Sequence, residues 1–357
     1  DYIPDFFRKE TAETEAEADR WYDDKKNNRR PPELLPRDEV ARAINSEVKA
    51  GRGSPHGGVF LDVSTRMPAE VIRRRLPSMY HQFKELADVD ITAEAMEVGP
   101  TCHYVMGGIA VESDTAAARG VPGLFAAGEV AGGMHGSNRL GGNSLSDLLV
   151  FGRRAGLYAA RYADDLATAP VVDDAQVDAA AAEALRPFSA ESPEAGAVPE
   201  NPYTLHQELQ QTMNDLVGII RREGEMAEAL QKLAELRRRA RRAGVEGHRQ
   251  FNPGWHLALD LRNMLLVSEC VARAALERTE SRGGHTREDH PGMNREWRRV
   301  NLLCALADPT GVLAVSDPER GQIDLTRVTT DPIRPDLLAL FDKEELVKYL
   351  AEEELYE

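Results

Sequence analysis

The sequence predicts an α/β region followed by a bundle of α-helices. Between residues 97 and 130, short apolar runs alternate with glycine, a pattern typical of strands joined by tight turns. Between residues 204 and 278, apolar residues recur at helical spacing in three successive stretches. With 357 residues, of which 42% are apolar, the chain can form about two domains with buried cores.

The N-terminal part of the chain predicts helices separated by polar turns. Apolar residues that recur on one face indicate the helices, and proline or glycine indicates the breaks. The expected elements, in order, are a charged helix around Trp21 and Tyr22, a helix over Arg37–Lys49, a strand over residues 59–63, and a helix over residues 68–86 that is interrupted near Pro77.

The central segment predicts a strand, a glycine-rich loop and a helix. Residues 124–129 read as an apolar strand ending in Gly-Glu, and a strand-end acid binds ribose hydroxyls in dinucleotide-binding folds. A glycine-rich loop over residues 132–142 leads into a helix, where Ser144 and Asp147 fit a capping pattern. The positions expected to be buried on this helix are Leu145, Leu148, Leu149, Ala155 and Tyr158.

The glycine-rich loop is the part of the sequence that predicts a ligand-binding site. It places His135, Asn138 and Arg139 just before a helix N-terminus, where free N–H groups and a positive dipole favour anions. Glycine lets the backbone approach a ligand, and one arginine can hold a carboxylate through two parallel hydrogen bonds. The loop predicts a site for an anionic ligand, and the alternative is a surface loop with a solvated arginine.

The C-terminal half predicts a surface connection, a three-helix bundle and a hairpin. Residues 165–203 are rich in alanine, aspartate and proline, which favours the connection. The elements expected after it are a helix with the stripe Leu205, Leu209, Leu216 and Ile220, a second with Met226, Leu230 and Leu233, a buried third over residues 255–276, a polar loop over residues 281–293, a hairpin of residues 312–315 and 322–325, and a solvated acidic helix over residues 343–357.

Charge and cysteine content exclude several kinds of function. The net charge of −16 argues against nucleic acid as a partner, because phosphate binding needs a basic surface. Cys102, Cys270 and Cys304 form no CxxC pair, so we expect no disulfide framework and no metal site made by this chain alone. No apolar run is long enough to span a membrane, and no signal peptide is visible.

Three neighbouring motifs resemble the flavoprotein subunits of succinate dehydrogenases and fumarate reductases. Residues 100–109, PTCHYVMGGI, are similar to the family signature P-T-x-H-Y-x-M-G-G-I. Residues 122–129, PGLFAAGE, resemble the family's second FAD-contacting strand, and residues 135–145, HGSNRLGGNSL, resemble its H-G-x-N-R-L-G-G-N-S-L loop. Residues 281–289, SRGGHTRED, resemble a segment of the family's helical domain, so the resemblance covers roughly residues 35–300.

The resemblance implies an architecture for the whole chain. It implies a partial FAD-binding, Rossmann-like domain with a partial capping domain, followed by a C-terminal helical bundle. The implied parts are the remainder of the capping domain at residues 1–95, the last part of the FAD-binding domain at 96–162, a connection at 163–203, the helical domain at 204–300, and a hairpin with an acidic tail at 301–357.

The family's binding residues carry over onto matching positions of this chain. The resemblance implies that His103 and Arg139 each bind one carboxylate of succinate or fumarate. The implied FAD-binding residues are Glu129, which would hold the ribose, and Asn143, Ser144 and Leu145 at the start of the helix. Asn143 has the alternative role of shaping the loop.

The reaction that the resemblance implies is the oxidation of succinate to fumarate. A hydride leaves one methylene group for FAD while a base removes a proton from the other, and binding both carboxylates fixes the substrate. Electrons would then pass through a partner iron–sulfur subunit to quinone. Since no anchor is visible in the chain, the resemblance places it on the cytoplasmic face of the plasma membrane through partner and anchor subunits.

The chain also departs from the family pattern. It lacks the GxGxxG turn for the FAD pyrophosphate, the histidine that links FAD covalently in many members, and the arginine that transfers the proton. Arg52 follows a helix that resembles a segment lying after that arginine, so we interpret Arg52 as a turn residue. We therefore assign no catalytic residue, and we expect the chain to start inside the capping domain and to lack parts needed to hold FAD alone.

Other functions stay open at this point. Fumarate reductase would run the same site in reverse, and L-aspartate oxidase shares the fold but differs in the loops at residues 106–109 and 139–143. A non-catalytic remnant that only binds a partner subunit is consistent with the missing GxGxxG turn. A helical interaction module is disfavoured, because binding a partner does not require His103 together with Arg139.

Overall fold

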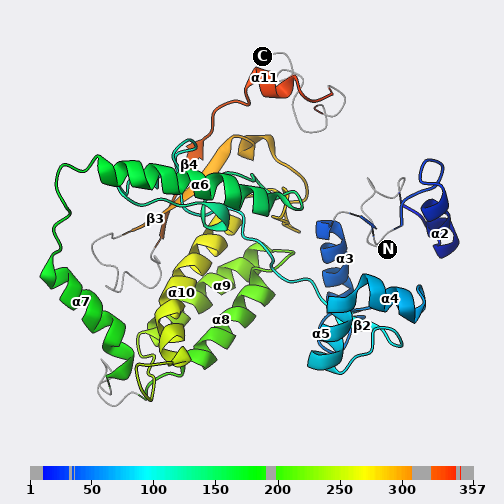
Figure 1. Ribbon diagram of the computed structural model, residues 1–357, viewed down its shortest axis with the longest axis horizontal. Helices are drawn as coiled ribbons and strands as arrows, with labels where there is room; N and C mark the ends of the chain where they lie inside the picture. Colours follow the sequence, from blue (N-terminus) through cyan, green and yellow to red (C-terminus); the bar gives the residue numbers. More distant parts are fainter. Residues whose placement is uncertain are drawn as a thin grey trace. The chain divides into compact units, whose positions relative to one another are not determined.

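The structure is a computed structural model that describes residues 11–31, 34–35, 37–189, 198–307, 323–342 and 346. The chain divides into two compact units, Asp1–Asp165 and Leu166–Glu357. Figure 1 traces both units in sequence order. Among the described residues, no helix is both long and apolar enough to cross a membrane.

The first unit contains mostly short helices. Its elements are α2 (Glu15–Asp23), α3 (Arg37–Lys49), β1 (Val59–Leu61), α4 (Ala69–Arg75), α5 (Pro77–Ala87), β2 (Met96–Val98), the 3-10 helix η2 (Gly128–Val130) and α6 (Asn143–Asp164). The expected helix over Arg37–Lys49 is confirmed at both ends. The expected interruption at Pro77 is also confirmed, because this proline cannot continue α4 and instead occupies the first turn of α5.

A small apolar core holds α4, α5 and the two short strands together. β1 and β2 pair antiparallel, with Val59 opposite Val98. Ile72, Ile91 and Met96 are buried, and six partly buried apolar side chains pack against them. This core forms from segments that the sequence predicted separately, because the strand over residues 59–63 finds its partner only at Met96–Val98.

The strand expected over residues 124–129 is not part of a sheet in the described structure. Phe125 makes a single bridge to Ala117, and Gly128–Val130 turns as the 3-10 helix η2. Both two-stranded sheets of the described residues are formed by other segments. An apolar run favours a strand only where a neighbouring strand pairs with it, and the described residues place none beside this run.

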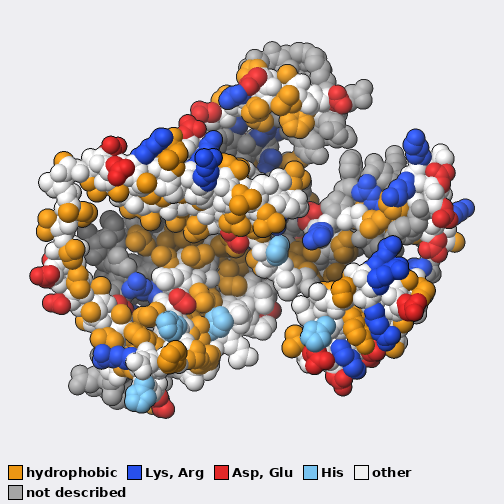
Figure 2. Space-filling model, viewed as in Figure 1, with side chains coloured by type: hydrophobic (Ala, Val, Ile, Leu, Met, Phe, Trp, Pro, Cys, Tyr) orange, Lys and Arg blue, Asp and Glu red, His pale blue; other side chains and the backbone are white. Residues whose placement is uncertain are grey.

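The apolar face of α6 differs from the prediction. Leu145 and Leu149 are 67% and 77% exposed, and Leu148 is exposed as well, whereas Ala155 and Tyr158 are partly buried. Figure 2 shows hydrophobic side chains over the surface of this helix. The spacing correctly identified an apolar face, but spacing does not determine what covers it. The capping prediction is also wrong, because Gly142 precedes the helix without a side-chain cap.

The second unit is a helical bundle with an added hairpin. Its elements are α7 (Asp174–Leu185), the 3-10 helix η3 (Arg186–Phe188), α8 (Pro202–Leu216), α9 (Glu223–Ala240), α10 (Pro253–Glu277), the 3-10 helix η4 (Arg295–Trp297), β3 (Val300–Leu306), β4 (Ile323–Thr329) and α11 (Pro335–Leu338). Helix α7 lies inside the segment expected to be a plain connection. Alanine favours the helix, and the Asp173 side chain caps it by accepting from the Ala175 N–H.

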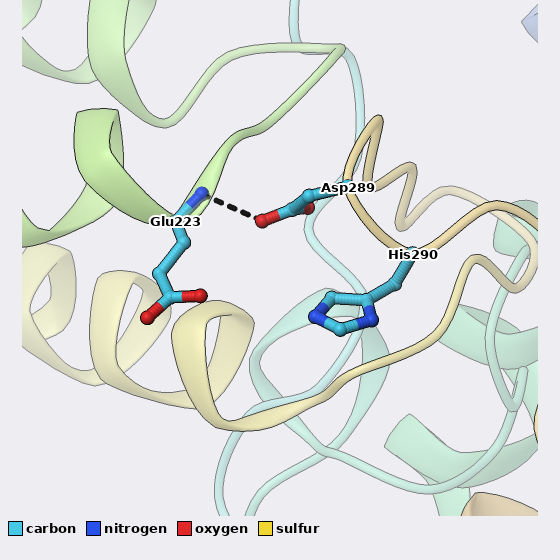
Figure 3. A group of neighbouring side chains, drawn as sticks. All are labelled: Glu223, Asp289 and His290. Carbon is cyan, nitrogen blue, oxygen red and sulfur yellow. Dashed lines mark hydrogen bonds between the residues drawn. The ribbon is translucent and has the colours of Figure 1, made fainter.

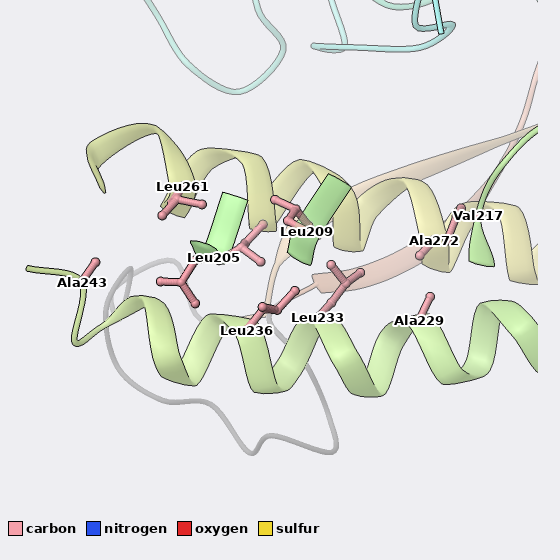
Figure 4. Packing of buried hydrophobic residues seen from close by; sticks show 10 residues of the cluster. Leu205, Leu209, Val217, Ala229, Leu233, Leu236, Ala243, Leu261 and Ala272 are labelled. Atoms are coloured by element: carbon pink, nitrogen blue, oxygen red, sulfur yellow. The ribbon is translucent and has the colours of Figure 1, made fainter. Parts of the chain in front are cut away.

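Helices α8, α9 and α10 enclose the main apolar core. Leu205 and Leu209 of α8 pack against Leu233 and Leu236 of α9 and against Leu261 of α10 (Figure 4). Each buried leucine stabilises the fold by about 1.5–3 kcal/mol relative to an exposed one. The three predicted helices are thus confirmed, except that α8 ends at Leu216 and leaves Ile220 beyond it.

The hairpin pairs differently from the prediction. β4 overlaps the predicted strand at residues 322–325, but its antiparallel partner is β3, with Cys304 opposite Leu325. The other predicted strand, residues 312–315, lies outside the described residues. The predicted acidic helix over residues 343–357 also lies outside them, apart from Leu346. Alternation favours a strand but does not identify its partner.

The polar loop after α10 closes over a buried arginine. Arg287 is 1% exposed, and its Nη1 donates to the carbonyl oxygens of Ala275 and Leu276 at 3.1 and 3.0 Å. These carbonyls belong to the last turn of α10, which has no further helical N–H groups to accept from. Asp289 accepts two hydrogen bonds from the same guanidinium, at 2.7 and 2.8 Å, and balances its charge. The loop therefore ends the helix.

Candidate functional site

The first two family-like motifs meet along the backbone. Ile109 N–H donates to the carbonyl of Val130 at 2.8 Å, and Gly132 N–H donates to the carbonyl of Ile109 at 3.0 Å. Gly108 has a φ of +143°, and a Cβ there would lie 2.3 Å from the Val130 oxygen. Only glycine permits this approach, so the M-G-G-I sequence brings residues 105–109 against the segment that carries Glu129.

Glu129 lies in the 3-10 helix η2 and contacts the first motif. Its Oε1 accepts from the Val105 N–H at 2.9 Å. The side chain remains exposed, and a carboxylate has lone pairs for more than one donor. Glu129 can therefore accept a ribose hydroxyl as well, although the structure places it in a tight helical turn and not at the end of a sheet strand.

A buried carboxylate connects the first motif to the third. The Asp147 side chain is 4% exposed, and its Oδ2 lies 3.1 Å from His135 Nε2. The Tyr104 hydroxyl donates to the same oxygen at 3.5 Å, and the Tyr104 and His135 rings meet edge to face. Burial and the negative charges of Asp147 and Glu129 raise the pKa of Tyr104, so its hydroxyl stays protonated.

Arg139 lies on the face of Tyr104. Its guanidinium carbon is 4.6 Å from the ring centroid, and its Nη1 donates to the carbonyl of Leu140 at 3.2 Å. Its Nε is buried and has no hydrogen-bond partner among the described residues. Buried donors normally have partners, so this orphaned N–H fits an anionic group supplied by a ligand.

His103 lies close to this arrangement along the chain but is exposed. It precedes Tyr104, and the Arg139 guanidinium lies on the Tyr104 ring. The structure thus brings Arg139 to the residue next to His103, and no hydrogen bond joins these two side chains in the described part of the chain. Both side chains have nitrogen atoms that can donate hydrogen bonds to a carboxylate, so the pair would suit a ligand that carries two carboxylates.

The start of α6 forms the third part of the site. Asn143, Ser144 and Leu145 lie in its first turn, and Gly142 precedes them with a φ of +85° and no side-chain cap. Gly141 has ordinary backbone geometry, and a Cβ there would meet nothing within 4 Å. Neither packing nor backbone strain explains Gly141, so this open surface beside the positive end of a long helix fits a bound group.

Sequence reasoning missed two residues of the site. Tyr104 belongs to a recognised motif, but the sequence indicated no role for it. In the structure, the Arg139 guanidinium lies on its ring. Asp147 was interpreted as a helix cap, whereas it is buried and contacts both His135 and Tyr104. An acidic residue among the apolar positions of a helix is the signal that could have identified Asp147, because a buried acid needs partners.

A separate cluster in the second unit has the composition of a metal site. Glu223 at the start of α9 lies close to Asp289 and His290 of the loop after α10 (Figure 3). The Asp289 carboxylate already accepts from the Glu223 N–H at 2.9 Å and from two nitrogens of Arg287. These contacts hold the pKa of Asp289 below its usual value, mainly through Arg287. The cluster is therefore explained as an ion-pair network that joins the loop to α9.

Comparison with known proteins assigns families to both units. Residues 10–145 match the family model described as FAD binding domain, and residues 206–332 match the one described as fumarate reductase flavoprotein C-term. FAD is accordingly the cofactor of this domain. The residues described above fit it, since they offer an exposed acid, an open glycine surface and an uncapped helix N-terminus.

Named relatives agree with these matches. The chain is 40% identical over 277 residues to one of the subunits of the fumarate reductase (CoM/CoB) of Methanothermobacter marburgensis, covering 78% of this chain and 48% of that protein. It is 39% identical over 265 residues to the succinate dehydrogenase flavoprotein subunit of Coxiella burnetii, covering 71% and 44%. The chain spans about half the length of the curated relatives that it matches.

Solved structures show the same similarity. Mycobacterium smegmatis Sdh1 in complex with UQ1 matches with 64% identity and a TM-score of 0.78, over 92% of this chain and 52% of that chain. An Escherichia coli quinol fumarate reductase matches with 32% identity and a TM-score of 0.70, over 84% and 49%. Two family models, named relatives and solved structures agree: the chain belongs to the family of succinate dehydrogenase and fumarate reductase flavoprotein subunits.

Proposed function

We propose that this chain carries the dicarboxylate-binding part of a flavoprotein that oxidises succinate to fumarate. The observation that supports this most directly is the buried, unpartnered Nε of Arg139, which lies beside Tyr104 and the start of α6. A guanidinium with a free donor can hold a carboxylate through two parallel hydrogen bonds. Its charge also offers the local attraction that an anion needs, since the chain carries a net charge of −16.

In the proposed mechanism, Arg139 and His103 hold the two ends of the substrate. The Tyr104 ring and the Leu140 carbonyl restrict the guanidinium plane, and Asp147 in turn restricts Tyr104 and His135. Fixing both carboxylates removes rotational freedom before the reaction, which lowers the barrier. FAD, when bound, supplies the acceptor for the hydride. Glu129 and the start of α6 would hold this cofactor.

We assign no proton-transferring residue in this chain. Arg52 donates to both carboxylate oxygens of Glu47 at 2.6 and 2.9 Å, and it is exposed. These contacts support its interpretation as a turn residue, because a catalytic arginine would have to give up this ion pair to reach a substrate. The arginine that would transfer the proton is proposed to lie outside these 357 residues.

We also propose partners and a cellular location for this protein. A relative named quinol fumarate reductase supports a quinone acceptor, and one named a flavoprotein subunit supports partner subunits. We propose that these partners are an iron–sulfur subunit and membrane anchor subunits. We propose that the protein lies on the cytoplasmic face of the plasma membrane and is held there by these partners. Affinity purification of the tagged protein from a membrane fraction would test this, with co-purified iron as the readout.

The substrate proposal is tested by replacing Arg139 in the full-length gene product that contains this chain. Succinate-dependent reduction of dichlorophenolindophenol is measured for the wild type, Arg139→Ala and Arg153→Ala. Loss of the carboxylate contact should lower kcat/KM at least about 100-fold, since charge-assisted pairs contribute a few kcal/mol. Arg153, an exposed arginine of α6, is the matched control and should leave activity unchanged. Equal activity of both variants would reject the carboxylate role.

Direction and catalytic competence need separate measurements. Fumarate reductase is the second candidate, because a relative with that name is 40% identical. The ratio of fumarate reduction by reduced viologen to succinate oxidation by dye would distinguish the two directions. A non-catalytic remnant is the third candidate, and the purified protein would then show no flavin absorbance.

A further inference from the structure

Two cysteines with no role in the proposed site lie next to each other in the second unit. Cys270 belongs to α10 and Cys304 to β3, and these two elements pack together. The Cys304 thiol donates a weak hydrogen bond to the Cys270 carbonyl oxygen at 4.0 Å, so the two residues are in direct contact. Cys304 is exposed and Cys270 is partly buried, so a small reagent would reach Cys304 first.

The surroundings distinguish the two thiols chemically. The hydrogen bond from Cys270 and the nearby Arg273 charge lower the pKa of Cys304 to about 7. The same hydrogen bond and burial raise the pKa of Cys270 above its usual value. At neutral pH, Cys304 is therefore often a thiolate, which is the nucleophilic form, while Cys270 keeps its proton. Arg273 is held in place by Glu269 at 2.8 Å.

We propose that Cys304 and Cys270 form an oxidation site in which hydrogen peroxide attacks Cys304 and Cys270 then closes a reversible disulfide between β3 and α10. An exposed, activated cysteine beside a second cysteine that can resolve it is the arrangement found in peroxide-sensing sites. The proposal does not depend on the dicarboxylate site, because both cysteines lie in the helical unit, Leu166–Glu357.

The proposed oxidation of the two cysteines has two steps. The Cys304 thiolate displaces hydroxide from hydrogen peroxide, so an S–O bond forms, the O–O bond breaks and a sulfenic acid results. The Cys270 sulfur then attacks the Cys304 sulfur, an S–S bond forms, and hydroxide leaves with the Cys270 proton as water. In total, two thiols and one hydrogen peroxide give one disulfide and two waters. The sulfurs lose the two electrons that the peroxide oxygens gain.

The disulfide would tie the hairpin to the bundle. Cys270 and Cys304 are 34 positions apart, and the loop with Arg287 and Asp289 lies between them. Closing this loop covalently restricts the unfolded chain, so the oxidised protein should unfold at a higher urea concentration than the reduced protein.

The test uses the reduced full-length protein that contains this chain, treated with hydrogen peroxide at pH 7. Non-reducing peptide mapping should find a Cys270–Cys304 disulfide that dithiothreitol reverses. Cys102 is the matched control, because it is an exposed cysteine in the other unit. Alkylation at neutral pH should label Cys304 about tenfold faster than Cys102, because a cysteine with a lowered pKa is more often in the nucleophilic thiolate form.

Two variants separate the steps. Cys270→Ser should accumulate sulfenic acid at Cys304, which dimedone traps, because the resolving thiol is missing. Cys304→Ser should leave Cys270 reduced under the same conditions. Equal oxidation rates at Cys102 and Cys304, or wild-type protein oxidised at Cys304 without a disulfide to Cys270, would overturn the proposal.

Discussion

At the scale of single residues, the role of each side chain in the site depends on the residues that surround it. Arg139 could be recognised from its glycine-rich loop, because an arginine before a helix start favours an anion. Asp147 could not, because the same residue type at that position also fits a helix cap. Only the packed structure places Asp147 against His135 and Tyr104.

Substitutions of Gly141 and Gly142 test whether a ligand binds against the open surface beside these glycines. Gly141→Ala should leave the free energy of unfolding within about 0.5 kcal/mol of the wild type, because a Cβ there meets nothing within 4 Å. It should weaken FAD or dicarboxylate binding about tenfold, since overfilling a site costs about 1–3 kcal/mol. Urea unfolding and ligand titration of the full-length protein measure the two effects.

Gly142→Ala is the contrasting variant in the same experiment. Its φ of +85° is strained for alanine, so it should lower the free energy of unfolding by about 1–2 kcal/mol. Normal ligand binding by Gly141→Ala would show that the space beside this glycine is solvent and not part of the binding site.

At the scale of elements, the end of α10 shows how a polar loop can stabilise a helix. Helical spacing predicted α10 well, but nothing in the spacing indicated that Arg287, beyond the helix, caps its last carbonyls. The motif at residues 281–289 was recognised by resemblance only. In the structure, Arg287 and Asp289 of this segment form hydrogen bonds that join the end of α10 to the start of α9.

Replacing Arg287 should destabilise the second unit strongly. Arg287→Met leaves two helix carbonyls without donors and removes the cation that pairs with Asp289, so the free energy of unfolding should fall by about 3 kcal/mol. Arg222→Met removes a similar but exposed pair with Glu288 and should cost much less, because solvent screens an exposed ion pair. Urea unfolding followed by circular dichroism compares the two, and similar losses would contradict the capping role.

At the scale of the whole molecule, the partly buried His285 determines how the stability of the second unit should depend on pH. His285 accepts from Arg221 Nη1 at 2.8 Å and donates to the Arg278 carbonyl at 3.1 Å. Burial, with the charges of Arg221 and Arg287, lowers the pKa of His285 to about 4. Its usual value is 6.5, so between these pH values the unfolded chain binds a proton that the folded chain does not.

Stability should therefore fall as the pH is lowered from about 6.5 towards about 4, by on the order of 1–3 kcal/mol. Urea unfolding at pH 7.0 and at about pH 5.5 measures the first part of this loss, above the range in which most carboxylates titrate. His285→Gln, which cannot gain a proton, should lack this part of the dependence. An unchanged pH dependence in that variant would contradict the assignment.

The sequence by itself determined the family, the helices at Arg37–Lys49 and in the bundle, and the motifs around His103 and Arg139. These follow from local spacing and from residue order, which the chain carries without folding. Tertiary structure decided the β3–β4 pairing, the exposed face of α6 and the contacts of Asp147 and Arg287. Each of these depends on which distant segment lies nearby, and that information exists only once the chain has folded.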